Sequence, residues 1–147
     1  MLPLALVLSL SAMALAVPFR DQSIAVQGKL LCNGKPAGGV FVRLTEEEIF
    51  INDELSTTHT NGDGVFHLQG KDYGISTIDP RIDIFHNCND EGSFTLDIQQ
   101  ECPNLLSFAV PEHTVTLGYR VPKHLFDLGT KDLGMSETNH WQYRKCP

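Results

Sequence analysis

Hydrophobic and polar residues alternate with a period of two along most of the chain, and no long segment shows the 3.6-residue period of a helix. In residues 24–32, for example, Ile24, Val26 and Leu30 fall on one face of an extended strand. Such alternation places one face of a strand on a core and the other toward water. It predicts strands at residues 24–32, 40–44, 65–68, 81–85, 94–98, 105–110 and 115–121.

Short turn sequences separate these strands. Asn33-Gly34 follows the first strand, and Asn61-Gly62-Asp63-Gly64 precedes the third. Asparagine and glycine adopt the positive φ angles that tight turns require. A series of about seven or eight short strands with this spacing predicts an all-β sandwich or barrel. Residues 49–55 are too few for a helix, and residues 46–53 are interpreted as an acidic loop with at most one helical turn.

The N-terminal segment has the features of a secretory signal peptide. Residues 2–15 contain no charged side chain, and Ala14-Leu15-Ala16 is a small-x-small cleavage site. A membrane-spanning helix needs about 20 apolar residues, which is more than this run provides. We therefore expect residues 1–16 to be a signal peptide. Residues 17–147 are expected to form one secreted, extracellular domain that does not span a membrane.

The charge of the chain disfavours two classes of partner. The formal net charge is −7. Binding of nucleic acid depends on Lys and Arg contacts to phosphate, so an acidic domain of this size is not expected to bind nucleic acid. Attachment to anionic lipid through charge alone is disfavoured for the same reason.

The four cysteines predict disulfides. All of them follow the expected cleavage site, and an even number of cysteines in an exported chain is typical of disulfide bonds. No Cys-x-x-Cys pair is present, so a zinc site is not expected. Three pairings are possible. We favour Cys88 with Cys102, which flank the predicted strand 94–98, and Cys32 with Cys146, which would join the first strand to the tail.

Several sequence blocks carry a family resemblance. The most specific are Gly28-Lys29-Leu30-Leu31-Cys32 and Phe85-His86-Asn87-Cys88-Asn89-Asp90. Together with the order of the four cysteines, they resemble the nematode transthyretin-like family over residues 26–146. The resemblance implies a secreted protein with a transthyretin-like (prealbumin-like) Greek-key β-sandwich of seven to eight strands. It also implies an extracellular role, such as signalling or cell-surface bridging, without shared catalytic residues. Further matching blocks are residues 40–44, 60–66, 78–80 and 126–129.

The histidines and acidic residues predict no metal, cofactor or catalytic site. If residues 60 and 65 pair across a hairpin, His59 and His67 point to opposite faces of it. Residues 61–64 resemble part of a calcium loop, but Gly70 stands where such a loop needs a glutamate. Asp79 and Asp83 share one face of a predicted strand and are interpreted as a solvated face.

An enzyme of the same fold provides the catalytic alternative. Transthyretin-related hydrolases of 5-hydroxyisourate end in Tyr-Arg-Gly-Ser and carry a catalytic histidine on the first strand. This chain has Tyr143-Arg144-Lys145-Cys146, and its segment 24–31 contains no histidine. The resemblance therefore favours a protein that is not an enzyme, because fold alone does not imply activity.

The sequence thus predicts a secreted binding or adaptor protein whose partner is an extracellular protein or a cell-surface receptor. Loops on a rigid sandwich carry function in many proteins. We therefore expect the binding residues to be Glu46, Glu47 and Glu48 in the acidic loop and Asn89 and Asp90 in the segment 87–92. The alternative function is a carrier of a small hydrophobic ligand.

Overall fold

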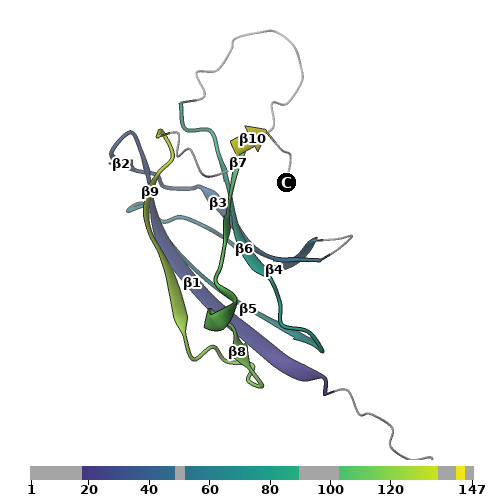
Figure 1. Ribbon diagram of the computed structural model, residues 1–147. Helices are drawn as coiled ribbons and strands as arrows, with labels where there is room; N and C mark the ends of the chain where they lie inside the picture. Colours follow the sequence, from purple (N-terminus) through teal and green to yellow (C-terminus); the bar gives the residue numbers. More distant parts are fainter. Residues whose placement is uncertain (1–17, 49–51, 90–102, 136–141, 145–147) are drawn as a thin grey trace, which may run out of the picture.

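The computed structural model describes residues 18–48, 52–89, 103–135 and 142–144. This part of the chain is almost entirely β-structure, and it forms two five-stranded sheets packed face to face (Figure 1). No helix in these ranges is long and apolar enough to cross a membrane. The elements are β1 (Arg20–Cys32), β2 (Lys35–Pro36), β3 (Phe41–Glu47), β4 (Asn52–His59), β5 (Val65–Gly74), β6 (Pro80–His86), β7 (Asn104–Ala109), the 3-10 turn η2 (Glu112–Thr114), β8 (Thr116–Leu117), β9 (Leu125–Asp132) and β10 (Gln142–Arg144).

The long strand β1 is the centre of the first sheet. It pairs antiparallel with β5 over ten residue pairs, from Arg20–Gly74 to Lys29–Val65. On its other side it pairs antiparallel with β8 and parallel with β9. The parallel pairing shifts register between Gln27 and Lys29, at a β-bulge. In Figure 1, β8 and β9 lie beside β1 along most of its length.

The second sheet has the strand order β10-β7-β6-β3-β4, and all its neighbouring strands are antiparallel. The chain enters this sheet at β3, leaves it for β5, and returns at β6, so strands close in sequence lie in different sheets. These crossings, with two sheets around one core, confirm the predicted all-β, transthyretin-like Greek-key sandwich.

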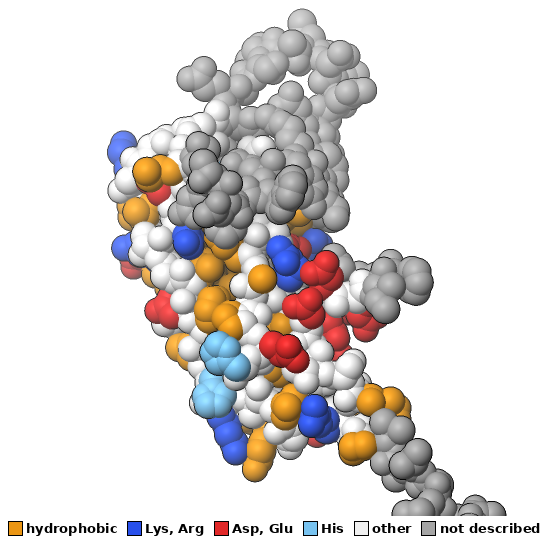
Figure 2. All heavy atoms as spheres, in the orientation of Figure 1, with side chains coloured by type: hydrophobic (Ala, Val, Ile, Leu, Met, Phe, Trp, Pro, Cys, Tyr) orange, Lys and Arg blue, Asp and Glu red, His pale blue; other side chains and the backbone are white. Residues whose placement is uncertain are grey.

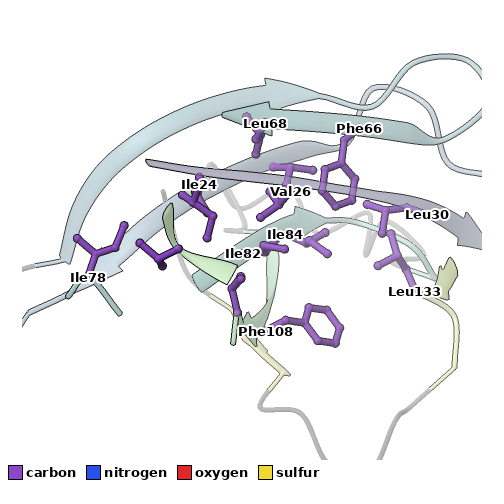
Figure 3. Packing of buried hydrophobic residues seen from close by; sticks show 14 residues of the cluster. Ile24, Val26, Leu30, Phe66, Leu68, Ile78, Ile82, Ile84, Phe108 and Leu133 are labelled. Carbon is purple, nitrogen blue, oxygen red and sulfur yellow. The ribbon is translucent and has the colours of Figure 1, made fainter. Parts of the chain in front are cut away.

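Alternating side chains of both sheets fill the space between them. Figure 3 shows Ile24, Val26 and Leu30 from the first sheet facing Ile82 and Ile84 from the second. These side chains are fully buried. Burying one such aliphatic side chain contributes about 1.5–3 kcal/mol. The period-two pattern of the sequence therefore identified the core correctly on both sides. The remaining buried members are Val42, Leu44, Phe66, Leu68, Ile78, Phe108, Val110, Val115 and Leu133.

The turn at residues 61–64 joins the two sheets and does not form the predicted hairpin. The backbone N–H of Asn61 donates to the carbonyl oxygen of Val65, and that of Gly64 donates to Asn61, so the tight turn itself is present. The strand before it, β4, pairs with β3 in the second sheet, whereas β5 pairs with β1 in the first. The assumed pairing of residues 60 and 65 across a ladder is therefore wrong, and His59 and His67 belong to different sheets.

Three other segments differ from the prediction. Residues 52–59, of which only the first two were assigned to the acidic loop, form β4. The predicted strand 115–121 is reduced to the two-residue β8, and the chain then leaves the sheet. Strand β9 was not predicted. The predicted strand 94–98 lies outside the described residues.

A disulfide bond joins Cys32 to Cys88, with 5.8 Å between their Cα atoms. The predicted pairings of Cys32 with Cys146 and of Cys88 with Cys102 are therefore wrong. The prediction rested on Cys88 and Cys102 flanking one strand, but Cys32 ends β1 in the first sheet and Cys88 follows β6 in the second. The bond thus connects the two sheets at one end of the sandwich. Cys102 and Cys146 lie outside the described residues.

We expect Cys102 and Cys146 to form the second disulfide. Asn104 of β7 is paired with Arg144 of β10, and the two cysteines lie two residues beyond this pair in opposite chain directions. Because Cys32 and Cys88 are bonded to each other, an even number of cysteines leaves these two to pair. Non-reduced protein cut after arginine, lysine and glutamate gives separate peptides for Cys88 and Cys102, because Glu91 lies between them. Mass spectrometry should find the linked pair; a Cys102–Cys102 cross-link between chains would contradict it.

Candidate functional site

The predicted acidic binding loop is mostly β-structure. Glu46 and Glu47 are the last residues of β3, and only Glu48 follows the strand. Glu47 is exposed and makes an ion pair with Arg81 at 3.6 Å. Glu46 is only 8% exposed and points into the sandwich. The interpretation of all three glutamates as one solvent-facing loop is therefore wrong, because strand alternation turns Glu46 inward.

The Glu46 carboxyl lies in an unusual electrostatic environment. The pKa of Glu46 is raised to about 8, and burial is the largest cause. A side-chain hydrogen bond with Asp72 and the negative charges of Asp72, Glu48 and Asp53 supply the rest of this increase. One carboxyl oxygen, Oε2, is buried without a hydrogen-bond partner in the described part of the chain. Such a side chain holds its proton near neutral pH instead of presenting a free charge to a partner.

The second predicted loop begins beside the disulfide. Asn89 has a positive φ of 60° and contacts the turn that follows β1: Nδ2 of Asn33 donates to its side-chain oxygen. Its own amide donates to the carbonyl oxygen of Gly134, past the end of β9. Asn89 therefore links three chain segments, which is a structural role. Asp90 lies outside the described residues.

Asp132 stabilises the same end of the molecule. Its carboxylate accepts backbone N–H groups of Asn33, Gly34 and Gly134 at 2.8–2.9 Å. The hydrogen bond from Gly134, with those from Gly34 and Asn33, holds the pKa of this carboxyl below its ordinary value. An ionised Asp132 thus fixes both turns, and the end that carries the disulfide is a rigid, internally bonded structure.

The opposite end of the molecule exposes several large hydrophobic side chains that the sequence analysis did not single out. They lie around the start of β1, the end of β5 and the loop that follows β8. Figure 2 shows hydrophobic and basic side chains together at this lower end, while acidic side chains gather along one flank. We call this surface the apolar end: Phe19, Tyr73, Ile75, Leu117, Tyr119 and Val121.

Contacts with β1 hold the apolar end in place. The rings of Phe19 and Tyr73 stack with 5.7 Å between their centroids. The N–H of Gly118 donates to the carbonyl oxygen of Asp21, which anchors the loop after β8. The Lys123 ammonium lies 3.5 Å from the ring centroid of Tyr119. The exposed rings are thus attached to a defined backbone.

A small hollow with positive charge lies in the region of the loop after β8. It has a volume of about 290 Å³, and its two charged lining residues are Lys71 of β5 and Arg120 of the loop. Leu55 and Pro122 supply apolar walls. Apolar surface beside Arg and Lys is suited to bind an apolar side chain next to an acidic group.

The described residues contain no group of three His, Cys, Asp or Glu side chains arranged to hold a metal ion. Asp79 is exposed, as expected, but Asp83 is buried and paired with Arg43, so its interpretation as part of a solvated face is wrong.

Two face-to-face sheets, one buried core and a disulfide between the sheets define this chain as a disulfide-linked β-sandwich domain. The chain belongs to the transthyretin-like family, which matches residues 27–111. It is 33% identical to transthyretin-like protein 5 of Caenorhabditis elegans over 135 residues, covering 90% of this chain and 91% of that protein. It is 36% identical to transthyretin-like protein 1 of the same organism, covering 78% and 73%. These matches confirm the family resemblance.

A further relative and one solved structure are also similar. Transthyretin-like protein 46 of Caenorhabditis elegans is 35% identical, with 86% of this chain and 68% of that protein covered. A 9R-lipoxygenase from Cyanothece is similar over 76% of this chain and 16% of its own, with 15% identity and a TM-score of 0.40.

Proposed function

We propose that this protein is secreted and acts, without catalysis, as a binding protein for an extracellular or cell-surface protein, which it contacts through the apolar end. The observation that carries the proposal is the gathering of six exposed large hydrophobic residues around the start of β1. Contiguous exposed apolar surface on a soluble domain is typical of an interaction site, and aromatic and arginine residues are enriched where binding energy concentrates.

The charge distribution supports a partner with an acidic contact surface. Arg120, whose Nε lies 3.9 Å from the Asp21 carboxylate, and Lys123 lie among the exposed rings, whereas Glu47, Glu48, Asp53 and Glu54 are exposed on and just after the β3–β4 strands. The chain is acidic as a whole, so a local group of cations gives one end a different preference from the rest. The alternative, a small-ligand carrier, needs an apolar pocket in the core or at an interface between copies of the chain, and in the core buried side chains occupy the space between the described sheets.

A pair of matched substitutions tests the proposed surface. Val121 is 73% exposed in the apolar end, and Met135 is 68% exposed near the disulfide end. Val121→Glu should reduce capture of the partner at least tenfold, because it places a charge against an apolar contact. Met135→Glu should leave capture unchanged, and neither exposed substitution should change stability by more than about 0.5 kcal/mol.

The measurement uses mature protein purified from the medium of a secretory host, whose first residue should be Val17. Each variant carries a photo-reactive tag, is incubated with extracellular fluid and cell surfaces, and its cross-linked proteins are identified by mass spectrometry. A protein captured by the wild type and Met135→Glu but lost with Val121→Glu is the expected partner. Equal capture by both variants would remove the apolar end from consideration, and retention in the cytosol would contradict secretion.

A further inference from the structure

Two carboxyl groups meet between the sheets, next to the apolar end. On β3 the inward-facing positions are Val42, Leu44 and then Glu46. On β5 Asp72 lies two residues beyond Gly70, on the same inward face. Leu44 lies against Gly70, since a Cβ at Gly70 would be 3.1 Å from its Cδ2 atom. The next inward positions therefore place Glu46 against Asp72, and their side chains form a hydrogen bond.

The close approach of the sheets at this point depends on a β-bulge. Leu44 pairs with Ser56 and Thr45 with Glu54, which leaves Leu55 of β4 without a ladder partner. A Cβ at Gly70 would lie only 2.8 Å from the Cβ of Leu55. The absence of a side chain at Gly70 thus allows β5 to lie against β3 and β4, which brings the two carboxyl groups together.

Every charged group that influences the Glu46 carboxyl is acidic. Just after β3 it is Glu48, from β4 it is Asp53, which pairs with Glu46 across the ladder, and from β5 it is Asp72. The β6 partner of Glu46 is the uncharged Pro80. No ion pair among the described residues brings a cation to either carboxyl group.

None of the nearest cations makes an ion pair with Glu46 or Asp72 among the described residues. Arg81 of β6 pairs with Glu47, whose side chain points away from the core. On β5, Lys71 has the opposite orientation to Asp72 and is exposed. On β1, Arg20 pairs with Gly74 and shares the inward face of Gln22, and its Nε is buried without a hydrogen-bond partner in the described part of the chain. Gln22 faces Asp72 across the ladder, but its side-chain amide is bonded to Ser76 and Ile78.

A buried and a half-buried carboxylate that lie together without an ion-paired cation cannot both be ionised at low cost, so such a pair retains one proton. With that proton the pair forms a charge-assisted O–H···O⁻ hydrogen bond, which is stronger than a neutral one. Without it, the two carboxylates repel each other across the gap between the sheets. A metal ion is not the favoured occupant, because no three ligands in the described part are arranged for one.

We propose that the Glu46–Asp72 carboxyl pair is a proton-dependent link between the two sheets, formed while the pair shares a proton and broken when both groups are ionised. It regulates the apolar end, because Tyr73 directly follows Asp72 on β5 and is stacked on Phe19. This regulatory role rests on the function proposed above, but the link itself does not.

The pH dependence of unfolding tests the link without any partner. The folded chain holds the Glu46 proton up to about pH 8, whereas an unfolded chain releases it near the ordinary pKa of 4.5. The folded state therefore binds more protons between these values, and stability falls as pH rises through this window and levels off above it. Glu46→Gln stays neutral and should remove this loss. Glu54→Gln, at an exposed position of β4, is the matched control and should behave as the wild type.

Carbon-13 NMR of the wild-type glutamate carboxyl groups gives the direct measurement. One carboxyl should titrate with a midpoint near 8, and Asp72→Asn should move that midpoint down by at least one pH unit, because it removes the nearest negative charge. A Glu46 midpoint near its ordinary value, or an Asp72→Asn variant with an unchanged midpoint, would overturn the proposal. This measurement does not depend on the stability of the Glu46→Gln variant.

Fluorescence of the apolar dye anilinonaphthalene sulfonate tests the coupling to the apolar end. We expect dye binding by the wild type to change at least twofold between pH 7 and 9, and binding by Glu46→Gln to stay constant. If the carboxyl titrates near pH 8 but dye binding does not change, the link exists and the regulatory role is wrong. Capture of the partner by the Val121→Glu variant does not depend on the carboxyl titration or on dye binding. Failure of the proposed function can therefore be distinguished from failure of the carboxyl link.

Discussion

Replacing Cys32 and Cys88 together with alanine is expected to lower the free energy of unfolding by about 4 kcal/mol. The bond closes a loop between cysteines that are 56 residues apart, and a cross-link of this length removes much of the conformational freedom of the unfolded chain. It also joins the end of β1 in one sheet to the segment after β6 in the other. Among the described residues, this bond is the covalent link between the two sheets apart from the chain itself.

Urea unfolding of the double variant and the wild type, without reductant, measures this difference. Dithiothreitol should lower the free energy of unfolding of the wild type by at least as much as the double substitution does. In the double variant, it should remove only the contribution of the expected Cys102–Cys146 bond. A difference below about 1 kcal/mol between variant and wild type would show that the bond does not form. If the variant fails to fold, a linked Cys32–Cys88 peptide from non-reduced wild type still tests the pairing.

The core could be predicted from the sequence, because side-chain alternation is a local property of a strand. Ile24, Val26 and Leu30 are buried by the same geometry whichever strands lie beside them. Strand β4 was missed because Leu55 is bulged and most of its other residues are polar, so no alternation is visible. Strand β9 was missed because Gly129, with a positive φ, interrupts its pattern.

The candidate site was less predictable, because it depends on which segments the fold brings together. Leu117, Tyr119 and Val121 alternate as residues of a half-buried strand do, yet the chain leaves the sheet after Leu117 and these side chains are exposed. Glu46 has the composition of a solvated loop, and only the strand register shows that it faces Asp72. The exposed rings and the buried carboxyl are both exceptions to the usual preference of their residue type, and such exceptions indicate function more strongly than the core does.

Asp83→Ala is expected to destabilise the protein by about 3–5 kcal/mol, the usual loss when one partner of a buried ion pair is removed. The Asp83 side chain is only 8% exposed, and Oδ2 lies 3.3 Å from the Arg43 guanidinium. Its Oδ1 accepts a hydrogen bond from the Ser107 hydroxyl at 2.7 Å. The same hydroxyl accepts a hydrogen bond from Arg81. Removal of the carboxylate thus leaves a cation and a hydroxyl without their acceptor.

Two further variants separate this loss from a general effect of removing an acidic residue. Asp79→Ala, four residues earlier, changes an exposed carboxylate and should alter stability by less than about 0.5 kcal/mol. Arg43→Met combined with Asp83→Leu should recover a large part of the loss, because no unpaired charge then remains buried beside Phe85. Urea unfolding at neutral pH measures all three. If Asp83→Ala were as stable as Asp79→Ala, the ion pair on this sheet face would not be a significant contact in solution, and the outer face of the second sheet would be solvated as the sequence first indicated.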